Sequence, residues 1–442
     1  MEQMKVIAPK EIKGEVNLPP SKSISNRALA IGSLTEGDST LANVSICDDT
    51  KVMALWMAKR MQKNFETIDI GAAGTAMRFS TAMLAVLEGT QTITGSERMK
   101  QRPIGILVEA LRTLGAQVEY VEKEGFPPLR ITGVPQMEGG EVELAGNVSS
   151  QFISALLLIA PRLKKGLTLK LTGEVVSRPY IDMTLSMMRI FGAKAGWTDA
   201  QTIVVEPVRY QPCDFRVESD WSAASYWYEV VALAPNEDAE VVLHGLFTES
   251  LQGDSRGAKV FERLGVSTEY RGEDVVLRKN GQCVERLDED FVDMPDLAQT
   301  FVVTCCMLGM PFHFTGLQSL KIKETDRIEA LKRELAKLGF RLEDRNDSEL
   351  IWDGVKEQGA GGEEQEECID TYEDHRMAMA FAPVALKRGS IIINNPQVVS
   401  KSYPFYWKDL KAVGFDLPTF NPQPSTPSSQ LSTISFEIPC LI

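Results

Sequence analysis

The sequence predicts an α/β fold that is built from one repeated unit and divided between two domains. Its 442 residues exceed what a single hydrophobic core usually supports. An apolar helical segment that ends at a glycine and leads into a strand-like run recurs at intervals of about 75 residues. Further runs between these segments are rich in β-branched residues, which is typical of strands. Together these observations favour repeated α/β units over a helical solenoid.

Five glycines mark the repeat. They are Gly115, Gly192, Gly265, Gly339 and Gly414. Glycine often ends a helix because it adopts the left-handed conformation without a Cβ penalty. One instance would carry no information, but five at nearly constant spacing indicate a repeated unit. A sixth, degenerate copy is expected at 54–65, so that six units can form two domains of three.

Periodicity predicts the elements within the units. The helix before Gly115 has apolar residues on one face, and the helix before Gly339 opens with Asp326 and Glu329 spaced as a capping box. Strands are predicted at Glu141–Leu144, Leu167–Leu171, Thr202–Val205 and Ile391–Ile393. The Pro/Ser-rich segment after residue 417 breaks the pattern, and we expect a C-terminal tail there.

Composition narrows the class of protein. There are 47 Lys and Arg against 61 Asp and Glu, which gives a formal net charge of −14 and argues against a nucleic-acid or membrane-surface partner. Three histidines, and seven cysteines without a CxxC pair, predict neither a metal site nor a disulfide framework. The N-terminal residues have no apolar signal core, and no stretch is long enough to span a membrane. We therefore expect a cytoplasmic protein.

Lys and Arg cluster in several loop-like segments that also contain Ser, Thr, Asn or Gly. These segments are PPSKSISNRALA, IGAAGTAMRF, SERMKQRPIG, GNVSSQFISALL, VVSRPYID, VDMPDLAQT, LKIKETDRIEAL, TYEDHRMAMAF and VVSKSYPFYW. A helix start that carries cations and hydroxyls is a natural anion site, although each segment alone could be an ordinary helix cap with solvated cations. Because so many occur over repeated units, we predict one basic pocket for a small, multiply anionic molecule.

The motifs SKSISNR, GAAGTAMR, RPIG, VSSQF, VSRPYID, KETDR and EDHRMAMAF occur in an order that resembles the 5-enolpyruvylshikimate-3-phosphate (EPSP) synthase family of enolpyruvyl transferases. The resemblance runs from about Lys5 to Phe415. It implies two domains, each with three α/β units around a pseudo-threefold axis in an inside-out α/β barrel. The implied bounds are 21–218 for one domain and 1–20 plus 219–417 for the other, followed by the tail at 418–442.

The family transfers the enolpyruvyl group of phosphoenolpyruvate to the 5-hydroxyl of shikimate 3-phosphate by addition and elimination, on the route to chorismate and the aromatic amino acids. This chemistry needs no cofactor and no metal. For shikimate 3-phosphate the resemblance implies contacts from Lys22, Ser23, Arg27, Ser149, Ser150, Gln151, Ser177, Arg178, Tyr180, Asp296, Ser319 and Lys323. For phosphoenolpyruvate it implies Lys22, Gly74, Arg102, Gln151, Arg327, Arg376 and Lys401.

The resemblance also implies catalytic roles. Asp296 is expected to act as general base on the 5-hydroxyl, Glu324 to move the proton at the methylene carbon, and Lys22 to contribute to catalysis. His375 is expected to orient Arg376.

Some positions depart from the family pattern. Ala72, Ser319 and Lys321 replace the more common Asn, Asn and Arg. Gly74 stands where the family binds the herbicide glyphosate, and its retention predicts sensitivity.

Two alternatives remain open from the sequence. One is enolpyruvyl transfer to UDP-N-acetylglucosamine, whose enzymes use a loop cysteine that has no counterpart in a matching loop here. The other is a non-catalytic anion-binding homologue, which retention of both Asp296 and Glu324 disfavours. The expected partners are the small-molecule substrates, and we expect a monomer.

Overall fold

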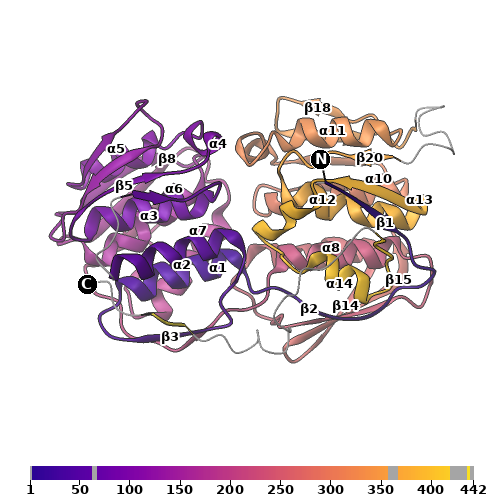
Figure 1. Ribbon diagram of the computed structural model, residues 1–442, viewed down its shortest axis with the longest axis horizontal. Helices are drawn as coiled ribbons and strands as arrows, with labels where there is room; N and C mark the ends of the chain where they lie inside the picture. Colours follow the sequence, from indigo (N-terminus) through magenta and orange to yellow (C-terminus); the bar gives the residue numbers. More distant parts are fainter. Residues whose placement is uncertain (1, 62–66, 357–366, 419–435, 439–442) are drawn as a thin grey trace. The chain divides into compact units, whose positions relative to one another are not determined.

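The computed structural model describes residues 2–61, 67–356, 367–418 and 436–438. The chain folds into two compact units, which are numbered here for reference (Figure 1). Unit 1 comprises Met1–Pro19 and Glu218–Thr426, and unit 2 comprises Pro20–Val217 and Pro427–Ile442. Each unit is described separately below.

Unit 2 alternates helices with short strands. Its helices are α1 (Lys22–Leu34), α2 (Asp48–Met61), α3 (Gly74–Val86), α4 (Glu97–Lys100), α5 (Gly105–Thr113), α6 (Ser150–Ile159), η1 (Ala160–Arg162) and α7 (Arg178–Ile190). Its strands are β3 (Ser39–Ala42), β4 (Thr67–Asp69), β5 (Thr90–Thr94), β6 (Gln117–Tyr120), β7 (Leu129–Thr132), β8 (Gly140–Ala145), β9 (Leu167–Thr172), β10 (Ala195–Trp197), β11 (Thr202–Val205), β12 (Phe215–Arg216) and β22 (Phe436–Ile438).

Unit 1 has the same alternation. Its helices are α8 (Trp221–Leu233), η2 (Gly253–Arg256), α9 (Gly257–Glu262), η3 (Pro295–Leu297), α10 (Ala298–Leu308), η4 (Gln318–Ile322), α11 (Arg327–Lys337), α12 (His375–Phe381), η5 (Ala382–Val384), α13 (Ala385–Arg388), η6 (Pro396–Lys401) and α14 (Tyr406–Ala412). Its strands are β1 (Gln3–Ile7), β2 (Lys13–Asn17), β13 (Glu240–His244), β14 (Leu264–Arg271), β15 (Asp274–Cys283), β16 (Leu287–Asp290), β17 (Phe312–Thr315), β18 (Glu343–Arg345), β19 (Glu349–Trp352), β20 (Cys368–Ile369) and β21 (Ser390–Asn394).

The described strands of each unit form three small mixed sheets. In unit 2 the strand orders are β4-β5-β7-β6, β10-β11-β9-β8 and β12-β3-β22, and in unit 1 they are β14-β15-β13-β2, β16-β17-β19-β18 and β1-β21-β20. Every four-stranded sheet has one parallel pair followed by two antiparallel pairs, as in β4 with β5, β5 with β7 and β7 with β6. This shared strand-direction pattern confirms a repeated α/β unit.

The five repeat glycines all have positive φ, between 81° at Gly192 and 110° at Gly414, as the sequence predicts. The predicted strands coincide with or lie within β8, β9, β11 and β21, and Asp326 caps α11 by accepting a hydrogen bond from Glu329 N at 3.1 Å. Gly265 differs from the others, because it lies inside β14, after α9 has ended at Glu262. The proposed sixth copy at 54–65 coincides with the end of α2 and continues into residues outside the described part.

Of the predicted tail at 418–442, the structure describes only position 418 and strand β22. The other tail positions lie outside the described residues. Strand β22 pairs antiparallel with β3, so that Phe436 lies opposite Leu41 and Ile438 opposite Ser39. In the sheet of β1, β21 and β20, strand β1 holds the corresponding antiparallel position beside the central strand. The C-terminal strand therefore completes the sheet of β3 in the same pattern.

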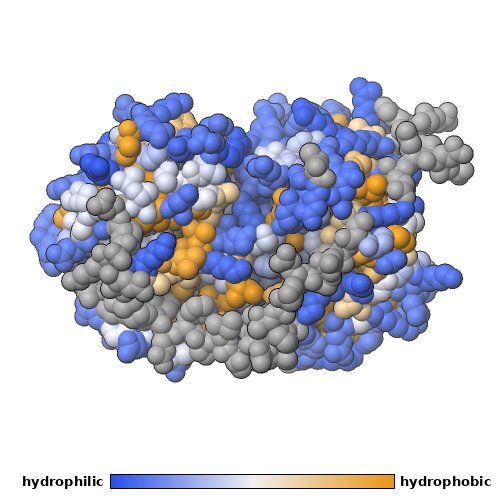
Figure 2. Space-filling model, in the orientation of Figure 1, coloured by the Kyte–Doolittle hydropathy of each residue, from blue (hydrophilic) through white to orange (hydrophobic). Residues whose placement is uncertain are grey.

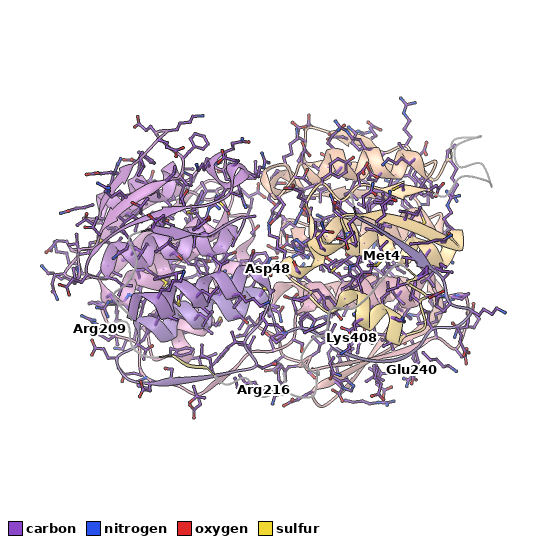
Figure 3. The ribbon with its side chains drawn as sticks, viewed as in Figure 1. Met4, Asp48, Arg209, Arg216, Glu240 and Lys408 are labelled. Atoms are coloured by element: carbon purple, nitrogen blue, oxygen red, sulfur yellow. The ribbon has the colours of Figure 1, made fainter. Side chains whose placement is uncertain are left out.

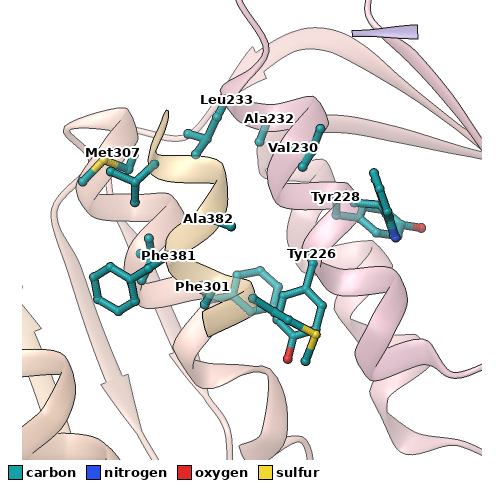
Figure 4. Packing of buried hydrophobic residues seen from close by; sticks show 14 of the residues in the cluster. Tyr226, Tyr228, Val230, Ala232, Leu233, Phe301, Met307, Phe381 and Ala382 are labelled. Atoms are coloured by element: carbon teal, nitrogen blue, oxygen red, sulfur yellow. The ribbon is translucent and has the colours of Figure 1, made fainter. Parts of the chain in front are cut away.

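The core of unit 1 is centred on three apolar helices (Figure 4). Tyr226, Val230 and Leu233 on α8 pack with Phe301 of α10 and with Phe381 of α12, and all five side chains are at most 1% exposed. The segments of α10 and α12 are almost entirely buried, which explains why both sequences are rich in apolar residues apart from a few buried polar ones. This packing fixes the starts of α8, α10 and α12 close to one another.

The outer residues are mostly polar. The face in Figure 2 is predominantly hydrophilic among the described residues, with smaller hydrophobic areas. Some of the charged residues in unit 1 are paired with one another. Glu240 of β13, labelled in Figure 3, accepts a hydrogen bond from Arg278 on the neighbouring β15 at 2.7 Å. Within the described residues, no helix is both long and apolar enough to cross a membrane.

One buried carboxyl interrupts the apolar core of unit 1. Glu229 on α8 is 0% exposed, and both of its carboxyl oxygens lack a hydrogen bond of good geometry in the described structure. Burial raises the pKa of Glu229 well above its ordinary value of 4.5, and the Thr304 hydroxyl only partly opposes this. Burial therefore favours the neutral carboxylic acid over the carboxylate in the folded chain.

This burial predicts a pH-dependent stability. As pH rises above about 4.5, the unfolded chain loses the Glu229 proton more readily than the folded chain does, so the free energy of unfolding falls as pH rises. Replacement by glutamine (Glu229→Gln) removes this dependence. In thermal unfolding, the Tm of Glu229→Gln minus the Tm of the wild type should increase between pH 5 and pH 8. The expected increase is roughly 2–4 °C for each kcal/mol by which the wild type is destabilised over that range. The exposed control Glu285→Gln should show no such trend, and a difference for Glu229→Gln that stays constant with pH would contradict the assignment.

Candidate active site

The start of α1 holds the first predicted anion-binding residues in unit 2. Lys22 is the first residue of the helix, and its Nζ lies 3.4 Å from Oδ2 of Asp49, a buried carboxylate at the start of α2. Ser21 precedes the helix without capping it through its side chain. Sequence reasoning missed Asp49, since an acid in the first turn of a helix is usually only a favourable interaction with the helix dipole.

Arg27 is a buried cation held by neutral groups. It is 3% exposed, and its guanidinium donates to Thr184 Oγ1 at 2.7 Å, to Ser154 Oγ at 3.1 Å and to the carbonyl oxygens of Ser23 and Tyr180. The ring of Phe79 lies beneath it at 5.4 Å. No carboxylate of the described residues forms an ion pair with it, and burial lowers the pKa of Arg27 to about 10. Such a cation is suited to an anionic ligand.

The start of α3 is equally cationic. A Cβ added to Gly74 would lie 2.7 Å from Nη1 of Arg102, so the Arg102 guanidinium rests against the glycine backbone. Arg78, one turn into α3, donates to the carbonyl oxygens of Gly74 at 3.2 Å and Pro103 at 3.3 Å. Two predicted phosphoenolpyruvate residues, Gly74 and Arg102, are thus brought together, and only a residue without Cβ allows this approach.

The start of α6 joins this group. Ser149 caps α6 by accepting a hydrogen bond from Gln151 N at 3.4 Å, the ordinary role that the sequence left open for one of the three polar residues. Gln151 Nε2 donates to Thr75 Oγ1 on α3 at 3.3 Å. Gln151 and Gly74 are therefore neighbours, while Ser150 is the first residue of α6.

The start of α7 contains three further predicted residues. Ser177 is buried and has φ 55°, a conformation that non-glycine residues rarely adopt, and its side chain does not cap the helix. Tyr180 contributes its backbone carbonyl oxygen to Arg27. Arg178 is stacked over Trp197 at 4.0 Å and donates to Ala200 O at 3.2 Å. Within unit 2, Arg178 thus contacts the end of β10 and the β10–β11 connection.

In unit 1 the predicted residues converge on one buried guanidinium. Arg327, at the first position of α11, is 1% exposed. Its Nε donates to Asp374 Oδ2 at 2.7 Å, its Nη1 to Asp296 Oδ1 at 3.2 Å, and its Nη2 to Glu324 Oε2 at 2.9 Å. The three carboxylates raise the pKa of Arg327 despite its burial. Both predicted catalytic acids therefore lie on the same guanidinium.

Other cations complete the cluster. Asp296 also accepts hydrogen bonds from Arg376 Nη2 at 2.8 Å and from Lys323 Nζ at 3.3 Å. Glu324 forms an ion pair with Lys401, whose Nζ lies 2.9 Å from its Oε1. Side chains from η3, the η4–α11 connection, α11, α12 and η6 thus meet at one place. The cations predicted in unit 1 do gather, but they do so around carboxylates, so the local excess of positive charge is small.

Three neighbours of this cluster escaped sequence reasoning. Arg376 Nη1 lies 3.4 Å from Tyr226 Oη, and its Nη2 lies 3.5 Å from Ser222 Oγ. Ser222 donates a hydrogen bond to Asp254, which is buried. Burial and the negative charge of Asp296 raise the pKa of Asp254 to about 6. Asp254 lies on η2, just before α9, in a segment with no distinctive pattern, whereas Asp374 stands beside His375 and Arg376 in the quoted motif.

The remaining predicted residues of unit 1 lie on η4 and at the start of α12. Ser319 lies on η4, and its Oγ is buried without a hydrogen-bond partner among the described residues. Lys321 on the same turn pairs instead with Asp347. His375 is 1% exposed, with Nδ1 3.6 Å from Asp374 Oδ1, so it packs beside the acid that holds Arg327.

The described residues contain no group of three or more His, Cys, Asp or Glu side chains placed to hold a metal ion. The arrangement in each unit is instead one of cations and hydroxyls at helix starts, and in unit 1 the two predicted catalytic carboxylates, Asp296 and Glu324, lie among these cations. This chemistry suits transfer between small anionic molecules.

Solved structures share the fold. An EPSP synthase from Acinetobacter baumannii matches with a TM-score of 0.75 at 21% identity, covering 95% of this chain and 100% of that chain. The enolpyruvyl transferase NikO from Streptomyces tendae matches with a TM-score of 0.72 at 13% identity, covering 94% and 98%. The fold is therefore a mixed α/β fold of the kind found in enolpyruvyl transferases.

Sequence comparison is more specific. The family model for EPSP synthase (3-phosphoshikimate 1-carboxyvinyltransferase) matches residues 6–66 and 54–410. A 3-phosphoshikimate 1-carboxyvinyltransferase of Bacteroides fragilis is 62% identical over 412 residues, covering 93% of this chain and 97% of the relative. One of Shewanella pealeana is 37% identical over 437 residues. The chain belongs to the EPSP synthase family, which confirms the resemblance seen in its motifs.

The Arg327 cluster predicts a large penalty for removing one buried carboxylate charge. Asp374 is 0% exposed, and Asp374→Asn retains the cap of α12 but removes the charge that faces Arg327. We expect the free energy of unfolding to fall by about 3 kcal/mol. Asp288→Asn removes an acid from the exposed pair with Arg286 and should cost less than about 1 kcal/mol. Denaturant unfolding measures both, and equal small effects would contradict the coupling.

Proposed function

We propose a division of roles among the described residues for the EPSP synthase reaction, which this chain catalyses as a 3-phosphoshikimate 1-carboxyvinyltransferase of the shikimate pathway. The 5-hydroxyl oxygen of shikimate 3-phosphate attacks C2 of phosphoenolpyruvate while the methylene carbon gains a proton. The resulting tetrahedral intermediate then loses that methyl proton and inorganic phosphate, which restores the double bond. Two anionic substrates must therefore be held close together, and two protons must be moved.

In unit 2, shikimate 3-phosphate is bound by cations and hydroxyls at the helix starts. The residues are Lys22, Ser23, Arg27, Ser149, Ser150, Gln151, Ser177, Arg178 and Tyr180. The burial of Arg27 among neutral groups supports this role, because an anionic substrate supplies the missing counter-charge. Phosphoenolpyruvate is contacted by Gly74 and Arg102, together with Lys22 and Gln151, and the close approach of Arg102 to Gly74 supports the pairing.

In unit 1, Ser319, Lys323 and Asp296 contact shikimate 3-phosphate, and Arg327, Arg376 and Lys401 contact phosphoenolpyruvate. The unpartnered hydroxyl of Ser319 supports its role. The observation that carries the proposal is that Asp296 and Glu324 both bind the Arg327 guanidinium, at 3.2 and 2.9 Å. Two carboxylates that share one rigid donor keep a fixed separation, as two proton transfers to one intermediate require.

The proton transfers are divided between these acids. Asp296 accepts the proton of the 5-hydroxyl. Glu324 gives a proton to the methylene carbon in the addition and takes one back in the elimination, and the ammonium groups of Lys401 and Lys22 offset the negative charge that develops. Asp296 and Glu324 lie on different elements, η3 and the η4–α11 connection, so each can serve a different atom of the intermediate.

The proposal extends to the whole chain. We assign two domains, 21–218 and 1–20 plus 219–417, each with three α/β units around a pseudo-threefold axis. In this proposal the enzyme is a cytoplasmic monomer, and its retention of Gly74 makes it sensitive to glyphosate. The tail at 418–442 has no assigned part in the reaction.

Phosphate release tests this assignment. The wild-type chain should release phosphate from phosphoenolpyruvate with shikimate 3-phosphate as acceptor but not with UDP-N-acetylglucosamine. Asp296→Asn and Glu324→Gln keep size and polarity but remove a proton acceptor. Each should lower kcat by roughly 10²-fold or more, with smaller changes in KM.

The matched control is Glu329→Gln, which alters a half-exposed acid in the first turn of α11 that pairs with Arg333. It should keep kcat within about twofold of the wild type. Full activity in Asp296→Asn or Glu324→Gln would contradict the assigned roles, and turnover with the UDP-sugar alone would contradict the acceptor.

A further inference from the structure

The turn that leads into α12 has an unusual backbone. Tyr372 and Glu373 are consecutive residues with positive φ, 52° and 56°. Side chains with a Cβ rarely occupy this region, and a pair of such residues persists only where surrounding contacts hold it. The turn ends at Asp374, the cap of α12 and the partner of Arg327. The conformation of this turn therefore sets where Asp374 lies.

A buried carboxylate on α11 holds the turn. Tyr372 donates its hydroxyl hydrogen to Glu334 Oε1 at 2.6 Å, and Glu334 is 0% exposed. The other oxygen, Oε2, accepts from Asp370 N at 3.0 Å and from Lys337 Nζ at 2.6 Å. Burial and the Glu334 carboxylate raise the pKa of Tyr372, so the hydroxyl remains a donor at neutral pH. Both oxygens of Glu334 are thus bound to the segment before Asp374.

Strand β21 anchors the same segment from a second direction. Asn394 donates through Nδ2 to Asp370 Oδ1 at 2.6 Å, and its carbonyl oxygen accepts from Thr371 Oγ1 at 3.0 Å. The turn closes when Asp374 N donates to Thr371 O at 2.8 Å. With β21 and α11 both attached, Tyr372 is the side chain that ties the residues of positive φ to the scaffold.

Glu334 and Arg327 belong to the same helix. They are seven residues apart, which is about two turns, so both side chains lie on one face of α11. The helix is therefore hydrogen-bonded to the turn at two positions. Arg327 binds Asp374, and Glu334 binds Tyr372 and Asp370. This pair of contacts fixes the turn relative to Arg327.

We infer that Tyr372 and Glu334 are positioning residues for the EPSP synthase reaction: they hold the strained turn that sets Asp374, and through it Arg327 and Arg376, for phosphoenolpyruvate. Arg376 follows Asp374 by two residues, and its backbone N–H donates to Asp374 Oδ1 at 2.9 Å. The inference rests on the proposed roles of Arg327 and Arg376. Neither Tyr372 nor Glu334 contacts the substrate in this account.

The first test removes one hydroxyl. Tyr372→Phe should raise KM for phosphoenolpyruvate roughly tenfold, because the lost hydrogen bond goes to a charged acceptor, while kcat changes less than KM. Tyr228→Phe is the matched control, since Tyr228 is a buried tyrosine of the same unit whose hydroxyl bonds Thr268 at 2.9 Å. It should leave this KM within about twofold of the wild type. Phosphate-release kinetics and Tm are measured for both variants.

The second test restores the turn by another route. Glu373 is exposed, and glycine adopts positive φ without a Cβ penalty, so Glu373→Gly lowers the cost of the turn itself. In the Tyr372→Phe background, Glu373→Gly should reverse at least half of the increase in log KM for phosphoenolpyruvate. A general loss of packing would not be repaired by this change.

The outcomes separate the inference from the assignment beneath it. An unchanged KM in Tyr372→Phe, an equal rise in Tyr228→Phe, or no recovery in the double variant overturns the positioning role. Arg376→Met tests the assignment: it should raise KM for phosphoenolpyruvate more than Tyr372→Phe does. If Arg376→Met leaves that KM unchanged, the proposed role of Arg376 is wrong whatever Tyr372→Phe shows.

Discussion

The site in unit 1 depends on the burial of a single guanidinium. Arg327 is almost inaccessible to solvent, so its charge must be matched by the three carboxylates that surround it. Because guanidinium is planar and rigid, it also fixes the directions from which Asp296, Glu324 and Asp374 approach. Most of the other contacts in the cluster follow from this arrangement, since Arg376, Lys323 and Lys401 bind carboxylates that Arg327 has already placed.

In unit 2, a buried guanidinium is stabilised by a different set of groups. Arg27, one of its buried cations, is surrounded by hydroxyls, carbonyl oxygens and an aromatic ring rather than by carboxylates. A cation stabilised only by neutral groups keeps its attraction for an anion, whereas one already paired with acids mainly organises its neighbours. The two units thus fit the complementary roles proposed for them: the buried cation of unit 2 suits an anionic ligand, and Arg327 of unit 1 holds the two acids proposed to transfer protons.

Much of the fold was predictable because its signal is local. A glycine that follows a helical segment readily adopts positive φ, and all five repeat glycines do so. The capping of α11 by Asp326 could also be predicted, because the cap and its partner Glu329 are three residues apart in the sequence. The site residues were predictable only through the resemblance of the motifs, because the approach of Asp296 to Arg327 joins residues 31 positions apart. Asp254, Asp49 and Glu334 were missed, since isolated acids in ordinary loops and helices give no pattern and acquire meaning only from burial and partners.

The most direct test of the central claim is the value of kcat/KM for phosphoenolpyruvate in Arg327→Lys, measured by phosphate release. Lysine keeps the positive charge but cannot bind three carboxylates in fixed directions. If the guanidinium organises the catalytic acids, kcat/KM should fall by about 10²-fold or more. A value within about threefold of the wild type would show that charge alone suffices, and it would contradict the account.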